Sequence, residues 1–333
     1  MPMRRTVLFL AGAALIAAVS GARAQETTLL RFAFGAPPQV HYNVQLFTPW
    51  AEQVMADSGG TLEIQMFGAG SLGREGEMID VVQSGAADIA LEIPTYYPGR
   101  FPLADVAALP MLVTDGAAAS RALWTLYEEG MFGSTFDGMK VLALSTPPAA
   151  MLMTTETEVA LPADTAGLRI AGGGRLRGDQ ITAMGAAPVD VRISELYQAL
   201  DRGVVNGAIS FYTAVPPFRL NEVASHYLEV PLGGSLMLVF MDQARFDSLP
   251  EAARNAIDAH SGAALSAAFG EVWDRAAETG RGMITGSGGE MRALDAAQQE
   301  AWAATLEPIV AAWGSETAGG EAIVDRLRTL LAE

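Results

Sequence analysis

Residues 196–209, LYQALDRGVVNGAI, have the plan of a helix, a glycine and a strand. Gly203 lies where the helix must end, and helices often end at glycine because the left-handed conformation required there costs glycine little. Asn206 then places a polar residue just before the short apolar run that is typical of a strand. A helix that leads through a glycine into a strand indicates an α/β fold.

The same plan occurs upstream in residues 78–90, MIDVVQSGAADIA. There Gly85 takes the place of Gly203, and Asp88 takes the place of Asn206. Two similar lobes would show such a recurrence. Units of this kind are also common in α/β proteins, and so short a match does not by itself establish a repeat.

The residues around the upstream unit alternate between strand and helix patterns. Apolar residues in short runs or at every second position predict strands, and apolar residues three and four apart predict helices. The expected strands cover residues 29–34, 62–67, 87–91 and 140–144, and the expected helices cover residues 42–55 and 74–83. This alternation predicts a lobe with a mainly parallel sheet.

Two further apolar segments, residues 151–154 and 236–240, are expected to mark crossings of the chain between two lobes. Two crossings make a hinge. The prediction is a two-lobed α/β fold with two mixed or parallel sheets flanked by helices. Its expected division is residues 1–24 as a signal peptide, 25–149 with 237–280 as lobe I, and 150–236 with 281–333 as lobe II.

The C-terminal part of the sequence predicts two helices. Ser248 is expected to cap a long helix that runs to about Thr279. Asp295 and Gln298 have the spacing of a capping box, which predicts the start of another helix. Pro308 is expected to end or kink that second helix.

The first 24 residues have the form of a secretory signal peptide. Arg4 and Arg5 precede an apolar run over residues 6–21, and the small residues of Ala22-Arg23-Ala24 suit a cleavage site before Gln25. The alternative is an uncleaved membrane anchor, but about 16 apolar residues fall short of the roughly 20 that a spanning helix needs. We therefore expect a mature chain in the periplasm with no stable insertion in a membrane.

Composition narrows the possible partners. Removal of the signal peptide with its three arginines takes the formal net charge from −17 to −20. A chain this acidic is not expected to bind nucleic acid or an anionic membrane surface. The sequence contains no cysteine, which is compatible with export and excludes thiol nucleophiles and cysteine metal sites.

Several short motifs occur in a characteristic order and spacing: GAGSLG at 68–73, VQSGAAD at 82–88, RFPL at 100–103, LPML at 109–112, GLRI at 167–170, GAAPV at 185–189, ELYQAL at 195–200, GVVNG at 203–207 and FDSLP at 246–250. In this order they resemble the solute-binding proteins of tripartite ATP-independent periplasmic (TRAP) transporters, of the dicarboxylate-binding type, over almost the whole mature chain. The resemblance implies two α/β lobes with a ligand between them and a long helix that spans both. It also implies delivery of the ligand to small and large membrane subunits that import it with a sodium gradient.

The resemblance implies an anchoring arginine two residues after the Lys or Arg of the Gly-Leu-Lys/Arg motif, but this position is Ala171 here. Some members carry an arginine four residues later, so Arg175 is the expected anchor for a ligand carboxylate. The alternative is a surface arginine on a glycine loop, and Arg169 and Arg177 are less favoured. Residues 172–174 are glycines, but no Gly-Lys-Ser/Thr follows, so a nucleotide loop is not expected.

Further ligand contacts are expected at strand ends. Ser210, Phe211 and Tyr212 follow the second helix–glycine–strand unit, where the resemblance implies a second anchor. Loops of the first lobe are expected to contribute as in other open α/β sheets. The first-lobe candidates are His41, Tyr42, Tyr96 and Tyr97. The competing interpretations are core packing for the aromatic residues and a solvated loop residue for His41.

One anionic anchor with aromatic walls favours an organic acid, a monocarboxylate with an apolar or aromatic body, as the ligand. The alternatives are a neutral or non-carboxylate solute, a role in another transport or sensing system, and a structural or adhesion module. An enzyme is not expected, because there are only three histidines, none with a metal-ligand partner at suitable spacing, and no Gly-x-Ser-x-Gly motif. No cofactor and no metal are expected.

Overall fold

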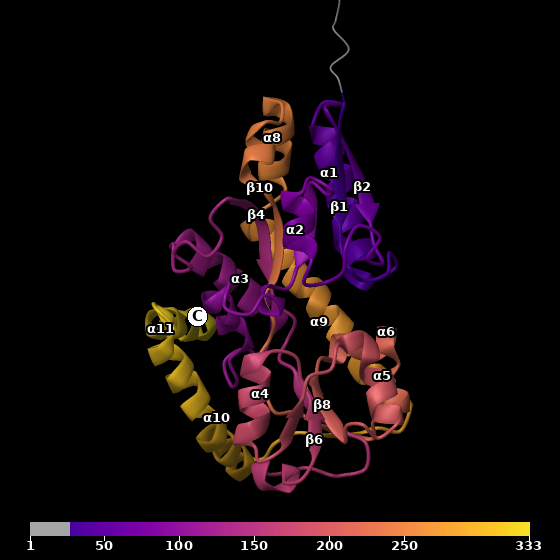
Figure 1. Cartoon of the computed structure of the whole chain (residues 1–333), viewed down its shortest axis with the longest axis vertical. Helices are drawn as coiled ribbons and strands as arrows, with labels where there is room; N and C mark the ends of the chain where they lie inside the picture. The colour runs from indigo at the N-terminus through magenta and orange to yellow at the C-terminus, as the bar shows by residue number, and fades with distance from the viewer. Residues whose placement is uncertain (1–26) are drawn as a thin grey trace, which may run out of the picture.

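The computed structural model describes residues 27–333, which form two α/β lobes, one above the other in Figure 1. Lobe I, the upper one, contains a five-stranded sheet, and lobe II contains a six-stranded sheet. The predicted two-lobed architecture is confirmed. The expected signal peptide, residues 1–24, lies outside the described residues.

The sheet of lobe I has the strand order β2-β1-β3-β10-β4. Its strands are β1 Thr28–Ala33, β2 Leu62–Phe67, β3 Ile89–Glu92, β4 Met139–Ser145 and β10 Met237–Asp242. β1 pairs parallel with β2 and β3, whereas β10 pairs antiparallel with β3 and β4. The chain therefore leaves lobe I after β4 and returns to the same sheet as β10, between β3 and β4.

The sheet of lobe II has the order β11-β9-β5-β8-β6-β7. Its strands are β5 Met151–Thr154, β6 Arg169–Ala171, β7 Ala187–Val189, β8 Gly207–Ser210, β9 His226–Leu228 and β11 Glu290–Arg292. β6 pairs parallel with β7 and β8, and β5 pairs antiparallel with β8 and β9. With β11 left aside, the two sheets have the same order and the same strand directions.

The two helix–glycine–strand units occupy equivalent places in these sheets. In lobe I, Asp88 accepts a hydrogen bond from the backbone N–H of Arg31, whose guanidinium donates to the carbonyl oxygen of Gly85 at 2.7 Å. The same two bonds are made in lobe II by Asn206, Arg169 and Gly203. The recurrence in the sequence is therefore a structural repeat, with one arginine tying each strand to the glycine that ends the neighbouring helix.

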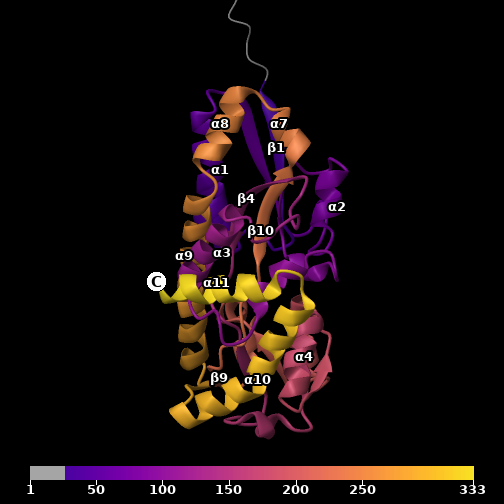
Figure 2. The same cartoon turned by 90° about the vertical axis from the view of Figure 1, so that its left-hand side faces the viewer.

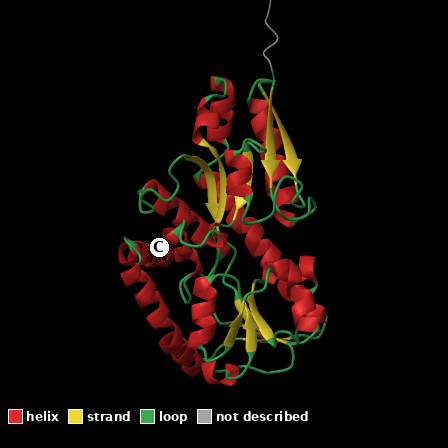
Figure 3. Ribbon diagram, viewed as in Figure 1, coloured by secondary structure: helices red, strands yellow, loops and turns green. Residues whose placement is uncertain are grey.

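Helices cover both faces of each sheet (Figure 3). Those of lobe I are α1 Thr48–Asp57, α2 Met78–Gln83, α3 Gly116–Glu128, α7 Gln243–Asp247 and α8 Glu251–Ala259. Those of lobe II are α4 Arg175–Ala183, α5 Ile193–Asp201 and α6 Val215–Phe218. Short 3₁₀ segments are η2 Pro94–Tyr96, η3 Pro102–Ala108, η4 Pro162–Thr165, η5 Tyr212–Ala214 and η6 Leu220–Glu222.

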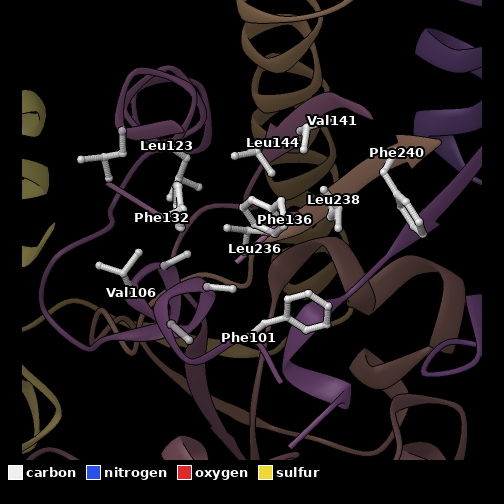
Figure 4. Close-up of a cluster of buried hydrophobic side chains, with 14 of the residues drawn as sticks. Phe101, Val106, Leu123, Phe132, Phe136, Val141, Leu144, Leu236, Leu238 and Phe240 are labelled. Carbon is white, nitrogen blue, oxygen red and sulfur yellow. The ribbon is translucent and has the colours of Figure 1, made fainter. Parts of the chain in front are cut away.

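Alternating residues of the lobe I strands enter two separate apolar cores. Ala143 and its partner Val239 pack on one face, and the adjacent pair of Leu144 and Leu238 packs on the other, as the period of two in a strand requires. Figure 4 shows the second of these cores, in which Leu144 and Leu238 lie near Phe101, Phe132 and Phe136. Lobe II has two further buried clusters of its own.

Two predicted helices differ from the structure at their starts. The helix expected at 42–55 opens with a π-helical turn, η1 Asn43–Phe47, before α1. The helix expected at 74–83 begins only at Met78, because Gly76 has a left-handed φ of 85°. The carboxylate of Glu92 accepts hydrogen bonds from the N–H groups of Gly76 and Met78 and holds this loop out of the helix.

The long helix expected from 248 to about 279 is instead two helices. α8 ends before His260, and α9 Ala263–Gly286 begins after Gly262, whose φ of 77° is left-handed and breaks the helix. α9 has 24 residues and is therefore about 36 Å long. It packs against α3 and β4 in lobe I and against η5 and α6 in lobe II, so it spans both lobes (Figure 1).

The C-terminal helices form a second long connection between the lobes. α10 Ala296–Glu316 begins at the predicted capping box of Asp295 and Gln298 but does not end at Pro308. α11 Gly320–Ala332 then packs against α3 and η3 of lobe I (Figure 2). Residues 281–333 are assigned to lobe II in the expected division, whereas α11 joins the apolar core of lobe I through Ile323 and Leu327.

The two short crossings lie just before the strands expected to contain them. The N–H of Leu232 donates to the carbonyl oxygen of Ala150 at 3.0 Å, and the N–H of Ala150 donates to the carbonyl oxygen of Gly233 at 2.9 Å. Both crossings are therefore one hydrogen-bonded pair of chain segments. Gly233 has a φ of 84° in this hinge, a conformation that strongly favours glycine.

Candidate functional site

Loops at the ends of the parallel strands bring the two lobes together. η2 follows β3 in lobe I, and residues 172–174 follow β6 in lobe II. A Cβ placed on Gly174 would lie 4.0 Å from the carbonyl oxygen of Thr95 in η2. Ligands of open α/β sheets bind at such carboxyl ends of strands. The candidate site is therefore the region where these loops of the two lobes approach each other.

Tyr96 lies in this region and senses charges from both lobes. Its pKa is raised to about 12, first by burial of its hydroxyl and then by the negative charge of Glu75 and Glu92 in lobe I. Arg192 lowers the same pKa and Asp190 raises it, and both belong to lobe II. Tyr96 is nevertheless 40% exposed as a residue, so one side of the ring remains free to contact a ligand.

Tyr97 has a structural environment. Its hydroxyl donates to Glu92 at 2.7 Å and accepts from the N–H of Ile79 at 3.1 Å. Burial is the main cause that raises the pKa of Tyr97. Its hydroxyl therefore already has two protein partners, whereas no hydrogen-bond partner is present for the Tyr96 hydroxyl among residues 27–333.

His41 and Tyr42 pack beside the spanning helix α9. The ring of His41 packs edge-on against Trp273, with the two ring centres 5.0 Å apart, and Tyr42 is buried against Phe34 and Phe269. Burial lowers the pKa of His41 to about 4, so this ring is neutral near pH 7. In the described part of the chain, Nε2 of His41 and Nε1 of Trp273 are both buried without a hydrogen-bond partner.

Arg175 is the first residue of α4, directly after Gly174 with its φ of 82°. Its side chain is 75% exposed, and its guanidinium pairs with Glu316 at 3.2 Å and with Asp179 at 3.9 Å. Ala171, at the position where the resemblance implies an anchor, is buried at the end of β6. The N–H groups of the first turn of α4 have no partner within the helix and favour an anion nearby.

Arg177 is buried at the hinge. Its guanidinium donates to the carbonyl oxygens of Leu232, of Gly233 at 2.9 Å and of Gly234 at 2.8 Å, and to the side chain of Gln180 at 3.0 Å. Burial lowers the pKa of Arg177 to about 10, so the group remains charged at neutral pH. Four of its five N–H donors are therefore occupied, and Arg177 fixes the hinge rather than offering a fork to a ligand.

Asp105 lies in η3 close enough to Arg175 and Arg177 for both to lower its pKa, but burial outweighs them and raises that pKa from 3.8 to about 6. The folded chain therefore binds this proton more tightly than the unfolded chain, and stability is lost as the pH rises from about 4 through 6.

Asp105→Asn is expected to raise the free energy of unfolding by about 1–2 kcal/mol at pH 8 and to have little effect near pH 4. Urea denaturation at the two pH values measures this, with Asp80→Asn as an exposed control, and a gain equal at both pH values would contradict it.

The segment after β8 places its three candidates differently. Ser210 is buried, and its Oγ has no hydrogen-bond partner among the described residues. Phe211 is partly buried, with the guanidinium of Arg177 5.8 Å from its ring centre. Tyr212 belongs to the core of lobe II, where its hydroxyl donates to Glu229 at 3.2 Å and Arg281 covers its ring. Ser210 and Phe211 thus lie beside the hinge, and Tyr212 faces the inside of lobe II.

Two charged residues of the interlobe region are not among the candidates from the sequence. Glu75 lies in the loop between β2 and α2, and Arg192 lies between β7 and α5. Both side chains are exposed, and within residues 27–333 neither makes a hydrogen bond or an ion pair. The two loops occupy equivalent places in the two lobes. Glu75 follows β2, which lies beside β1, and Arg192 follows β7, which lies beside β6. Because β1 and β6 both precede predicted ligand contacts, the repeat could have identified both loops.

The described residues contain no group of three or more His, Asp or Glu side chains arranged to hold a metal ion. None of the helices in residues 27–333 is both long enough and apolar enough to cross a bilayer.

Comparison with known proteins identifies the family. Residues 35–316 match the model of the bacterial extracellular solute-binding protein family 7. A solute-binding protein of Verminephrobacter eiseniae is 26% identical over 321 residues, which cover 92% of this chain and 91% of that protein. A C4-dicarboxylate-binding periplasmic protein of Rhodobacter capsulatus is 24% identical over 269 residues, or 76% of each chain.

Solved structures extend this comparison to the fold. A marine metagenome TRAP solute-binding protein specific for aromatic acids, crystallised with 3-hydroxybenzoate, has a TM-score of 0.86 and 26% identity over 92% of this chain and 98% of its own. A TRAP solute-binding protein of Rhodoferax ferrireducens with copurified benzoate has a TM-score of 0.85 and 26% identity over the same shares. With two lobes of repeated topology, a hinge of paired crossings and a family match over most of its length, the chain belongs to family 7 of the bacterial extracellular solute-binding proteins, and it is a solute-binding protein of the TRAP transporter type.

Proposed function

We propose that this chain captures an aromatic or otherwise apolar monocarboxylate between its two lobes and delivers it to the membrane subunits of a TRAP transporter. The observation that carries the proposal is the approach of the two loop sets at Gly174 and Thr95. This approach sets the start of α4, with Arg175, near the half-exposed ring of Tyr96. A positive anchor on one lobe and an aromatic wall on the other suit an aromatic acid.

The ligand class is supported by relatives of moderate similarity. The two TRAP proteins at 26% identity hold 3-hydroxybenzoate and benzoate, which are aromatic monocarboxylates. Arg175 pairs with Glu316 on the surface, and an exposed ion pair contributes only about 0–1 kcal/mol. Its guanidinium can therefore leave Glu316 for a ligand carboxylate at little cost when the lobes close.

The ligand class is tested by thermal-shift screening followed by calorimetry of the mature chain. The panel contains benzoate, 3-hydroxybenzoate, mandelate, succinate and a neutral sugar. A ligand at about 100 times its Kd adds roughly 2.7 kcal/mol of stability, which a melting curve resolves. Binding of the aromatic acids supports the proposal. Exclusive binding of succinate or of the neutral sugar would replace it with one of the alternative solutes.

Arg175→Ala is expected to weaken binding of the best carboxylate by about 10-fold to 150-fold, because one charge-assisted contact worth about 1.5–3 kcal/mol is lost. Isothermal titration calorimetry measures the change in Kd. Arg292→Ala is the matched control, since Arg292 is also exposed and paired with an acid, Glu158, but lies on β11 at the other edge of lobe II. Equal Kd values for wild type and Arg175→Ala would remove Arg175 from the site, and Arg192→Ala then tests Arg192, whose guanidinium has no partner among the described residues.

We also propose that the mature chain is periplasmic, begins at Gln25 and has no catalytic activity. The curated Rhodobacter relative is a periplasmic protein, and family 7 is a family of binding proteins. Mass spectrometry of the exported chain tests the cleavage site. A turnover screen against esters and glycosides tests the absence of catalysis, and a robust rate would overturn it.

A further inference from the structure

The carboxylate of Glu75 lies over the end of the first strand of lobe I. Gly35 follows this strand after Phe34, and a Cβ placed on Gly35 would lie 2.6 Å from Oε2 of Glu75 and even closer to its carboxyl carbon. The position of the Glu75 carboxylate thus depends on the absence of a side chain at residue 35. This packing directs an acid from the loop after β2 onto the loop after β1, at the ligand-binding ends of both strands.

Glu75 is the acid of its loop that has no partner. Glu77, two residues later, binds the guanidinium of Arg74 at 2.8 Å. Glu92, also nearby, accepts hydrogen bonds from Tyr97 and from three backbone N–H groups. For Glu75 the described residues supply neither a hydrogen bond nor an ion pair. An acceptor directed into a binding region and left without a donor is available to a ligand.

Glu75 lies near two tyrosines of its own lobe, and the facing part of lobe II carries a basic residue, Arg192, together with an acid, Asp190. The charge of Glu75 contributes to the raised pKa of Tyr42 and of Tyr96, which places it near both hydroxyls. The hydroxyl of Tyr96 also senses Arg192 of lobe II, which has no partner among the described residues either. The region beside Tyr96 therefore has the unpaired carboxylate of Glu75 on lobe I and the unpaired guanidinium of Arg192 on lobe II. A molecule that bridges the lobes meets opposite charges at its two ends.

We propose that Glu75 determines specificity by selecting carboxylates that also carry a hydrogen-bond donor, a hydroxyl or an ammonium group, at the end remote from the carboxylate. This inference rests on the proposed function, because it assumes that an acid binds between the lobes. When the lobes close, a donor-free ligand such as benzoate leaves Glu75 desolvated and unpaired, whereas a hydroxyl or ammonium group satisfies it. A second carboxylate at that end is repelled.

The test measures ratios of Kd rather than single values. Wild type, Glu75→Ala, Glu75→Gln and Glu77→Gln are titrated calorimetrically with benzoate, 3-hydroxybenzoate, 3-(aminomethyl)benzoate and benzene-1,3-dicarboxylate. The wild type is expected to bind the two donor-bearing acids at least about 10-fold more tightly than benzoate and to bind the dicarboxylate more weakly. Glu75→Ala is expected to reduce both preferences to within about threefold. Glu75→Gln, which keeps an acceptor but no charge, should lose more of the ammonium preference than of the hydroxyl preference.

The control variant and the outcomes below separate a failure of the role of Glu75 from a failure of the proposed ligand class. Glu77→Gln removes an acid two residues away that is already paired with Arg74, so its Kd ratios should match those of the wild type. If the wild type binds these acids but Glu75→Ala keeps the same ratios, the role of Glu75 is overturned and the proposed function stands. If the folded wild type binds none of the acids, the proposed ligand class fails, and the role of Glu75 fails with it. Melting curves of the variants show that a lost preference does not come from misfolding.

Discussion

Arg177→Ala is expected to lower the free energy of unfolding by about 3–5 kcal/mol. The guanidinium of Arg177 is buried and donates to three consecutive carbonyl oxygens of the second hinge crossing, those of Leu232, Gly233 and Gly234. Within the described residues, only Gly233 of these three has another donor, the N–H of Ala150. Alanine would leave two buried acceptors unpaired, at about 1–3 kcal/mol each, and a cavity in place of the side chain.

Denaturation in guanidinium chloride, followed by tryptophan fluorescence, measures this loss. Arg328→Ala is the matched control, since Arg328 is 42% exposed in α11 and its pair with Glu307 contributes at most about 1 kcal/mol. Arg177→Lys should fall between the two, because an ammonium group cannot place donors on all of the carbonyl oxygens that the planar fork reaches. A loss below about 1 kcal/mol for Arg177→Ala would show that water replaces the guanidinium and that the hinge does not depend on it.

The strand pattern could be predicted from the sequence because burial imposes it locally. β2 coincides with the expected strand at 62–67, and β5 coincides with the apolar segment at 151–154. The glycines at 85 and 203 have φ values of 72° and 64°, as the ends of the two helices require. These features depend on residues next to each other in the chain, which is why the recurrence of the helix–glycine–strand unit can be seen in the sequence alone.

The features that could not be predicted depend on distant contacts. Gly262 breaks the expected long helix because the N–H of Gly262 donates to the carbonyl oxygen of Leu142 in β4, 120 residues away in the chain. α2 begins later than expected because its preceding loop is bound by the carboxylate of Glu92, which lies at the end of β3. α11 packs on lobe I through Ile323 and Leu327, although the residues before α10 belong to lobe II. Local pattern carries no information about any of these partners.

For the candidate site, too, the sequence predicts where residues lie in the fold but not the direction in which their side chains point. The sequence predicts ligand contacts in the segments after the strands, and in the structure Tyr96 lies in η2 and Arg175 begins α4, next to the point where Thr95 and Gly174 approach each other. The sequence could not show that Tyr212 points into the core of lobe II or that Arg177 is used by the hinge. The direction of a side chain depends on the hydrogen-bond partners and packing that the folded structure supplies around it. The assignment of ligand contacts therefore remains a proposal that the variants of Arg175 and Glu75 test.

The spanning helix α9 contains two neighbouring glycines, Gly280 and Gly282, at which substitution by alanine is expected to change the free energy of unfolding in opposite directions. At Gly270, α9 passes so close to α3 that a Cβ would lie 2.6 Å from the Cα of Ala117 in lobe I. At Gly280, a Cβ would lie 2.7 Å from the carbonyl carbon of Tyr212 in lobe II and would overlap its oxygen. The helix is therefore docked to each lobe through a glycine. Gly282, half a turn further on, has no atom within 4 Å of a Cβ position.

Gly280→Ala is expected to lower the free energy of unfolding by about 2–4 kcal/mol, because the methyl group meets backbone that cannot give way without moving lobe II relative to the helix. Gly282→Ala is expected to raise it by about 0.5–1 kcal/mol, because alanine favours the helix and meets nothing. Both substitutions add the same methyl group to the same helix, so the difference between them isolates the contact with Tyr212. If chemical denaturation gave equal changes for the two variants, α9 would not be docked on lobe II at Gly280, and the lobes would be free to move along the helix rather than only about the hinge.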